Sequence, residues 1–166
     1  MIHNVIIRSY LKSDRNECLK LFDLNCPRFF SRDERSSMEL WLNGQDTGTI
    51  TYKSSMADFY YVALHNYEVV GCAGFYIVSN QPAARLTWSV INPENQSQGL
   101  GTKLVSHCIN QIESLFPSYR IELDTSQHTF AFFEKFDFQK TQITENGYGP
   151  GLHRYDMIKN AQTTIS

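Results

Sequence analysis

The chain has 166 residues, a net charge of −2 and a hydrophobic fraction of 42%. This length and composition predict a single domain with a packed core over residues 1–160, followed by a short tail over 161–166. The slight negative charge argues against a basic surface for nucleic acid, and no run approaches the ~20 apolar residues of a membrane helix. We therefore expect neither a nucleic-acid partner nor a membrane partner.

The cysteines and the N-terminus bear on location. The four cysteines form no Cys-x-x-Cys pair and lie at no zinc-finger spacing from a histidine, so we predict reduced thiols and no metal site. The N-terminal segment lacks a basic head followed by a long apolar run, which argues against a signal peptide. A cytoplasmic location is expected.

The first predicted elements are a strand and two helices. Residues 4–10 are rich in β-branched types and predict a strand, and a helix follows to about residue 24. Ser31 stands three residues before Glu34, which is the spacing of a capping box, so a second helix should begin there. Asn43-Gly44 should end it.

The rest of the chain predicts strands around one long helix. Residues 45–57 are polar and predict a loop, and Asn66-Tyr67 predicts a hairpin turn between the next two strands. The further predicted elements are strands at 58–65, 68–78 and 84–92, a helix at 99–116, a strand at 119–124, a helix at 127–136, and strands at 138–144 and 152–159. The order βααβββαβαββ implies an α/β (α+β) domain whose central mixed sheet has helices on both faces.

The segment 96–103 joins the end of a strand to the start of the clearest helix. It reads Gln96-Ser97-Gln98-Gly99-Leu100-Gly101-Thr102-Lys103. Such a junction points several unpaired backbone N–H groups into one small volume, and the helix dipole adds positive potential there. Glycines let the backbone approach a ligand closely. The segment therefore suits an anion such as a pyrophosphate, while a glycine-rich turn that merely starts a helix is the alternative.

Two better-known anion-binding loops do not fit this segment. A P-loop needs its lysine directly after the second glycine, but Thr102 separates Gly101 from Lys103. A dinucleotide-binding loop needs a third glycine where this chain has Leu104. The pattern that fits is Gln-x-x-Gly-x-Gly.

The surroundings of the loop resemble a known family. Val90-Ile91-Asn92-Pro93-Glu94 before it, and Phe-Phe-Glu-Lys-Phe-Asp-Phe at 132–138 after it, resemble the GNAT superfamily of acyl-CoA N-acyltransferases. The resemblance covers about residues 5–158. It implies a single-domain GNAT-like fold with a mostly antiparallel, twisted sheet, and an N-acetyltransferase that uses acetyl-CoA as co-substrate without a metal.

The resemblance also implies where acetyl-CoA lies. Loop amides would hold the pyrophosphate, and backbone groups around Val90 and Asn92 on a bulged strand would bind the pantetheine arm. The strand at 119–124 would splay away from that strand, leaving an opening for the thioester. The residues expected to bind the co-substrate are Val90, Asn92, Gln96, Ser97, Gln98, Gly99, Leu100, Gly101, Thr102, Lys103, Ser126 and Phe133.

Two positions depart from the family pattern in ways that matter for catalysis. Thr87 stands where many members carry a glutamate base, and Phe133 stands where a tyrosine acid is often proposed. Asp124 is one replacement base, and Tyr148 is a replacement acid or an amine contact. Each also has a structural interpretation, and so does His153, a further candidate. An ordered water chain is another alternative to a dedicated base.

On the acceptor side, Phe30 and Glu34 lie where the family builds its amine pocket. A carboxylate beside aromatic rings suits a cation, although the same residues also fit a helix cap and a hydrophobic staple. The expected partner is a small-molecule or peptidyl primary amine. The alternatives are an acyl-CoA-binding regulatory or sensor module without turnover, and an anion-binding domain unrelated to coenzyme A. Association into homodimers stays open.

Overall fold

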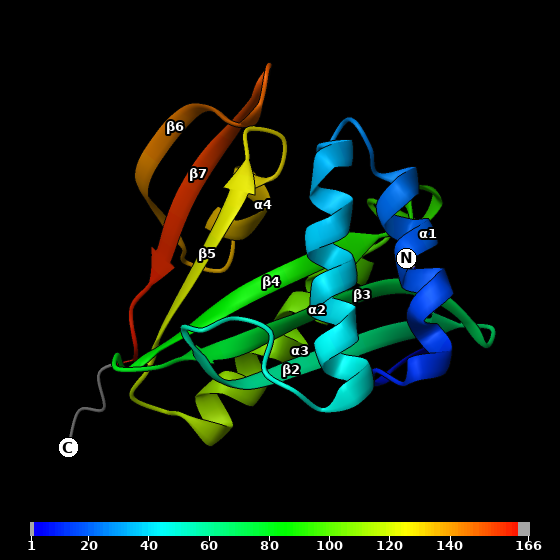
Figure 1. The fold of residues 1–166 in the computed structure, drawn as a ribbon, viewed down its shortest axis with the longest axis horizontal. Coiled ribbons are helices and arrows are strands. Elements are labelled where there is room, and N and C mark those ends of the chain that lie inside the picture. Colours follow the sequence, from blue (N-terminus) through cyan, green and yellow to red (C-terminus); the bar gives the residue numbers. More distant parts are fainter. Residues whose placement is uncertain (1, 163–166) are drawn as a thin grey trace.

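The computed structural model describes residues 2–162, in which a seven-stranded sheet is flanked by four α-helices (Figure 1). The elements in chain order are β1 Val5–Ser9, α1 Arg15–Leu24, α2 Arg35–Thr47, β2 Ser55–His65, β3 Glu68–Val78, β4 Ala83–Ile91, α3 Leu100–Leu115, β5 Arg120–Ser126, α4 Phe130–Glu134, β6 Gln139–Gly149 and β7 Leu152–Lys159. Of the tail expected at 161–166, residues 163–166 lie outside the described part of the chain.

The sheet has the order β1-β2-β3-β4-β5-β7-β6. Every neighbouring pair is antiparallel except β4 and β5, which are parallel. Helices α1 and α2 cover one face of the sheet and α3 covers the other (Figure 1). The predicted element order and the predicted mixed, mostly antiparallel sheet with helices on both faces are confirmed.

Two apolar clusters, one on each face, hold these layers together. On one face, α1 and α2 bury side chains such as Phe22 and Trp41 against the sheet. On the other, the stripe of α3 that contains Leu104, Cys108 and Ile112 is fully buried. Helical spacing produces both stripes, and burial of apolar area stabilises the layers by roughly 25 cal/mol per Å². Within residues 2–162, no helix has both the length and the apolar character needed to cross a membrane.

The start of the second helix follows the sequence prediction, but its end does not. Ser31 N–H donates to Glu34 Oε2 at 2.8 Å in a capping box that opens a short 3-10 turn, Arg32–Glu34, before α2. The helix then continues past Asn43-Gly44 to Thr47 and ends at Gly48, whose φ of 69° lies in the left-handed region. Gly44 is buried, and a Cβ there would clash with Thr51 Oγ1, so this glycine serves packing rather than termination.

The hairpin turn is confirmed, whereas two strand boundaries differ from the prediction. Asn66 and Tyr67 have φ values of 50° and 67°, as a two-residue primed turn requires. Strand β2 begins inside the predicted loop at 45–57, and β6 continues to Gly149 instead of ending near residue 144. The pairing of β6 with β7 skips between Thr144 and Gly149, and this irregularity hides the strand from a period-2 pattern.

Candidate active site

The site begins where the two parallel strands separate. Strand β4 pairs with β5 only from Ala83 to Arg85, and the two strands then diverge. In the same region the pairing of β4 with β3 shifts register, and Trp88 has a φ of 48°. The carbonyl of Trp88 accepts a hydrogen bond of 2.8 Å from the hydroxyl of the buried Tyr60, which fixes this bulge. The splayed strands and the bulge that the family resemblance implied are both present.

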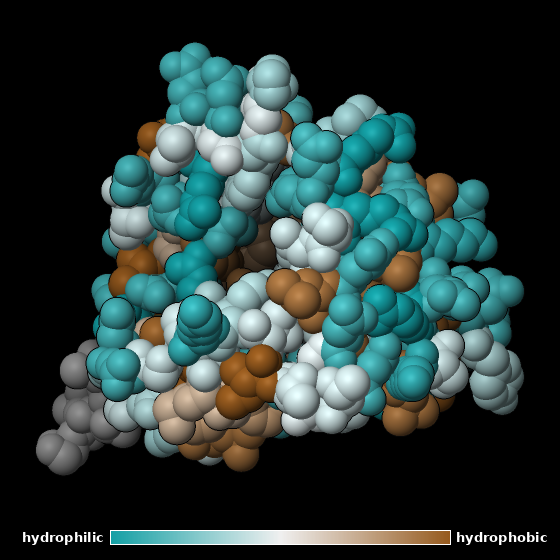
Figure 2. Space-filling model, viewed as in Figure 1, coloured by the Kyte–Doolittle hydropathy of each residue, from teal (hydrophilic) through white to brown (hydrophobic). Residues whose placement is uncertain are grey.

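A cavity of about 690 Å³ occupies the opening between the strands. Figure 2 shows it as a hollow with apolar atoms at its base, between the β5–β7 side of the molecule and α2. One end reaches the loop before α3 and the other reaches Tyr148. The predicted site residues that line it are Phe30, Glu34, Gln96, Ser97, Gly99, Gly101, Thr102, Asp124, Ser126, Phe133 and Tyr148.

At one end of the cavity the glycine loop leads into α3. Ser97 and Gly99 have φ values of 66° and 83°, and no side chain caps the helix. Within residues 2–162, the backbone N–H groups of Gly99, Gly101 and Thr102 have no hydrogen-bond acceptor in the protein. These groups are therefore free to bind an anion at the positive end of the helix dipole.

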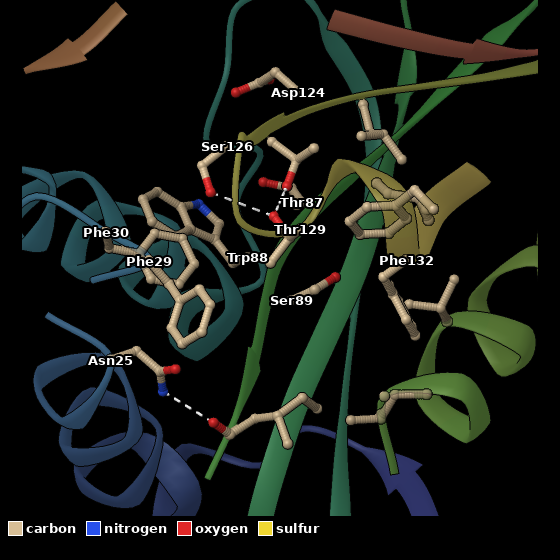
Figure 3. Close-up of a pocket in the computed structure, with 18 of the residues that line it drawn as sticks. Asn25, Phe29, Phe30, Thr87, Trp88, Ser89, Asp124, Ser126, Thr129 and Phe132 are labelled. Carbon is tan, nitrogen blue, oxygen red and sulfur yellow. Dashed lines mark hydrogen bonds between the residues drawn. The ribbon is translucent and has the colours of Figure 1, made fainter. Parts of the chain in front are cut away.

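Asn25, which the sequence prediction missed, joins three segments beside this loop. Its side chain is 4% exposed, and its Nδ2 donates to the carbonyls of Leu21 at 2.7 Å and Ile91 at 2.9 Å (Figure 3). Gln96 Nε2 in turn donates to Asn25 Oδ1 at 3.2 Å. The end of α1, the end of β4 and the glycine loop are therefore held in register. The sequence offers one sign of this role, because Asn25 is a polar residue directly after an apolar helical stripe.

Five residues expected at the co-substrate site do not line the cavity: Val90, Asn92, Gln98, Leu100 and Lys103. Val90 and Leu100 are buried in the core. The Asn92 N–H donates to the Val70 carbonyl at 2.9 Å, so it is already engaged in the sheet.

Strand geometry explains the first part of this difference. Successive residues of a strand direct their backbone groups to opposite neighbours, so Ile91 rather than Val90 or Asn92 faces the opening. The ammonium of Lys103 has a contact elsewhere in the structure, since its Nζ lies 3.3 Å from the Ile2 carbonyl. Lys135 is the lysine that lines the cavity.

Ser126 and Phe133 lie on the α4 side of the cavity. Ser126 ends β5, and its Oγ accepts a 3.2 Å hydrogen bond from the His128 N–H in the turn before α4. It also lies 3.5 Å from Thr129 Oγ1 (Figure 3). Phe133 packs edge-on against Phe132 with ring centroids 5.1 Å apart. Both residues shape the wall.

At the other end of the cavity, Asp124 and Tyr148 meet. The Tyr148 hydroxyl donates to Asp124 Oδ2, and Arg85 donates to Asp124 Oδ1 at 2.5 Å. Burial, followed by the charge of Asp124, raises the pKa of Tyr148, so its hydroxyl keeps its proton at neutral pH. Both oxygens of Asp124 are already engaged, which makes it a group that positions Tyr148 rather than a free base.

Glu34 lies beside this pair, and its carboxylate is available to bind a cationic ligand. Among the ion pairs of residues 2–162, none includes Glu34. Burial raises its pKa, the Ser31 N–H lowers it and the charge of Asp124 raises it further, with a net rise. Phe30 lies close by, beside Trp88 (Figure 3). His153 does not line the cavity; its Nδ1 accepts from the Asn146 N–H at 2.9 Å, between β7 and β6.

The chain is similar to one family of known proteins. A sequence model of the Acetyltransferase (GNAT) family matches residues 18–138. No curated protein sequence matches. A solved GNAT-family acetyltransferase structure from Desulfovibrio desulfuricans superposes with a TM-score of 0.76 at 17% identity, covering 95% of this chain and 99% of that one.

Two further solved structures are similar. The ribosomal-protein-S18-alanine N-acetyltransferase from Escherichia coli superposes with a TM-score of 0.74 at 16% identity, covering 98% of this chain and 97% of that chain. Ard1 from Thermoplasma volcanium gives a TM-score of 0.72 at 15% identity, covering 96% and 99% respectively. At these identities the structural likeness concerns the fold.

Proposed function

Since the chain belongs to the GNAT family of acetyltransferases, we propose that it transfers an acetyl group from acetyl-CoA to a primary amine of a small molecule or peptide. The observation that carries this proposal is the continuous cavity, which joins a free helix N-terminus to an unpaired carboxylate. The first suits an anionic phosphate group and the second suits a cationic amine. The free cysteines fit a cytoplasmic location.

The residues of the glycine-loop end fit acetyl-CoA. Gly99, Gly101 and Thr102 would hold the pyrophosphate through their N–H groups. The arm would run between Ile91 and Phe132, which line the cavity from β4 and α4. An ideal Cβ on Gly101 would come within 3.4 Å of the Phe132 ring, so the absence of a side chain there keeps this passage open.

The acceptor end supplies groups for the amine. Glu34 would bind the ammonium, and the Tyr148 oxygen would accept a hydrogen bond from it, because the single Tyr148 proton is directed at Asp124. We therefore prefer an amine-contact role for Tyr148 over that of an acid. The ammonium has an unperturbed pKa near 10.4, so it must lose a proton to Glu34 or water before the nitrogen attacks.

The transfer then needs no dedicated acid. The nitrogen forms a bond to the thioester carbonyl carbon, the carbon–sulfur bond breaks, and the second nitrogen proton leaves to solvent. Coenzyme A departs as a thiolate whose conjugate thiol has a pKa near 8.5, so it is a fairly stable leaving group. Phe133 at the position of the common tyrosine is compatible with this chemistry.

Two measurements test the proposal. Acetyl-CoA should raise the melting temperature, since a ligand that binds only the native state stabilises it. Release of free thiol should then occur with at least one primary amine from a panel. Stabilisation without thiol release would favour a non-catalytic acyl-CoA-binding module, and no stabilisation would contradict a coenzyme A site altogether.

A further inference from the structure

The acceptor end of the cavity has one wall made of aromatic rings. We define the aromatic wall as Phe30, Tyr52, Tyr76 and Trp88, all of which line the cavity and are half-buried. Phe30 stacks on Trp88 with ring centroids 6.1 Å apart and planes at 30°. Tyr52 and Tyr76 follow, with centroids 5.0 Å apart. Phe30 and Trp88 lie together in Figure 3, below Asp124.

The aromatic wall is held rigidly from behind. Trp41 is fully buried, and its ring stacks on Tyr52 at 5.7 Å with planes at 23°. Phe22, also fully buried, packs on Phe30 at 5.2 Å. The Trp88 Nε1 donates to the Tyr52 hydroxyl at 3.1 Å, which links the two halves of the wall. Such preorganised rings lose little conformational entropy when a ligand binds.

The charges near the aromatic wall leave one place for a cation. Asp124 is paired with Arg85 at 2.5 Å, and Arg154 is paired with Asp156 at 2.9 Å. Glu34 lines the same cavity, and no ion pair of the described residues includes it. An ammonium on Glu34 would therefore have its carbon substituent in the cavity that these four rings line.

We infer that the acceptor is a primary amine joined by a short linker to a flat aromatic ring. This inference rests on the proposed function and narrows its substrate class. An aromatic ring stacking on aromatic partners gains about 0.5–1.5 kcal/mol beyond its buried area, which a saturated ring does not gain. Glu34 sets the position of the nitrogen, and the aromatic wall sets the shape of what the nitrogen carries.

The same wall disfavours a peptide acceptor. A peptide brings an N–H and a C=O group at every residue, and each costs roughly 1–3 kcal/mol when it is buried without a partner. Phe30 and Trp88 offer no acceptor, and the Trp88 N–H is already donated to Tyr52, so only the hydroxyls of Tyr52 and Tyr76 could pair with peptide groups along this wall. A compact aromatic amine avoids this cost.

The test uses a matched pair of amines in the thiol-release assay. 2-Phenylethylamine and 2-cyclohexylethylamine have the same linker and similar size, and they differ in the flatness and π-character of the ring. We expect kcat/KM to be several-fold to about tenfold higher for the phenyl compound, which corresponds to the stacking energy above. A short peptide with a free N-terminal alanine should give at least tenfold lower kcat/KM than 2-phenylethylamine.

Variants assign the preference to the wall. Phe30→Leu, and independently Tyr76→Leu, should reduce the phenyl-to-cyclohexyl ratio towards one while acetyl-CoA still raises the melting temperature. Phe116→Leu, at the far end of α3, is the control and should keep the ratio.

Three outcomes overturn the inference. Equal kcat/KM for the two ring compounds in the wild type, or a preference for the peptide, would contradict the substrate class while leaving the acetyltransferase proposal intact. A wild-type ratio that survives both wall variants would contradict the assignment to the aromatic wall. Absence of thiol release with every amine would instead contradict the proposed function, and the inference would fall with it.

Discussion

The two ends of the cavity are built in different ways. The glycine-loop end is made of backbone from one continuous stretch, residues 96–102, at the start of a helix. The acceptor end is made of side chains from distant segments, with Glu34 ahead of α2, Trp88 on β4 and Tyr148 at the end of β6. A site formed by contiguous backbone leaves a motif in the sequence, whereas a site assembled from separate elements becomes visible only in the fold.

The largest expected effect is that of Gly101→Val, which alters only the glycine-loop end of the cavity. Gly101→Val should weaken acetyl-CoA binding at least a hundredfold, about 3 kcal/mol, because the added methyl groups would enter the space beside Phe132 that the co-substrate needs. Isothermal calorimetry gives the affinity, and circular dichroism should show unchanged helix content.

A control for the branched residue comes from the same helix. Leu115→Val places a β-branched side chain at the exposed end of α3, away from the cavity, and should leave acetyl-CoA affinity unchanged. If Gly101→Val bound acetyl-CoA as tightly as the wild type, the phosphate site could not lie at this loop.

Sequence reasoning worked for the fold wherever one local pattern decided the structure. The capping box at Ser31 and the primed turn at Asn66-Tyr67 both depend on residues close together in the chain. The end of α2 was predicted wrongly, because a local pattern does not show that Gly44 lies against Thr51 in the folded chain. Tertiary contact overrode the usual meaning of a glycine there.

The contrast between local patterns and tertiary contacts also applies to the site. Five loop residues that line the cavity could be identified in advance because their motif is contiguous: Gln96, Ser97, Gly99, Gly101 and Thr102. The pairing of Tyr148 with Asp124, and the bridging role of Asn25, depend on elements that meet only in three dimensions. Lys103 illustrates the converse, since its place in the motif predicts a phosphate contact, whereas its ammonium lies against the Ile2 carbonyl in the fold.

Among changes at the acceptor end, substitution of Glu34 should lower kcat/KM for the amine the most. Glu34→Gln removes the charge but keeps an oxygen for the Ser31 N–H, so the capping box survives. A hydrogen bond to a charged group contributes roughly 1.5–3 kcal/mol, so kcat/KM for the amine should fall about tenfold to a hundredfold. Glu39→Gln, the same change further along α2, should leave kcat/KM unchanged.

The pH profile gives a second readout for Glu34. Protonation removes the negative charge that attracts the ammonium, so wild-type activity should fall as the pH drops through a carboxyl pKa above the usual value of about 4.3. The variant should lack this acidic limb. Since burial disfavours the charged form in the folded state, Glu34→Gln should not lower the melting temperature at neutral pH. An identical acidic limb in both proteins would exclude Glu34 from the amine site.

Substitution of Tyr148, at the same end, should lower kcat/KM for the amine by a smaller factor. Tyr148→Phe removes one neutral hydrogen-bonding group, worth about 0.5–1.5 kcal/mol, so kcat/KM for the amine should fall roughly twofold to tenfold. Acetyl-CoA affinity should change little. Tyr67→Phe, at the exposed hairpin turn, is the control. A drop of a hundredfold or more in kcat alone would instead indicate an acid role, and Phe133→Tyr introduced into that variant should then recover part of the loss.

The smallest expected effect compares two lysines near the glycine-loop end. Lys135 lines the cavity, whereas the Lys103 ammonium lies against the Ile2 carbonyl. Exposed charges interact weakly through water and are screened by salt, so a lysine–phosphate contact at this rim contributes less than the backbone amides do. Lys135→Ala should weaken acetyl-CoA binding by about twofold to fivefold, with a smaller loss at high salt, and Lys103→Ala should change it less than twofold. The reverse order would mean that Lys103 leaves the Ile2 carbonyl when the co-substrate binds, and that the motif had indicated its role correctly.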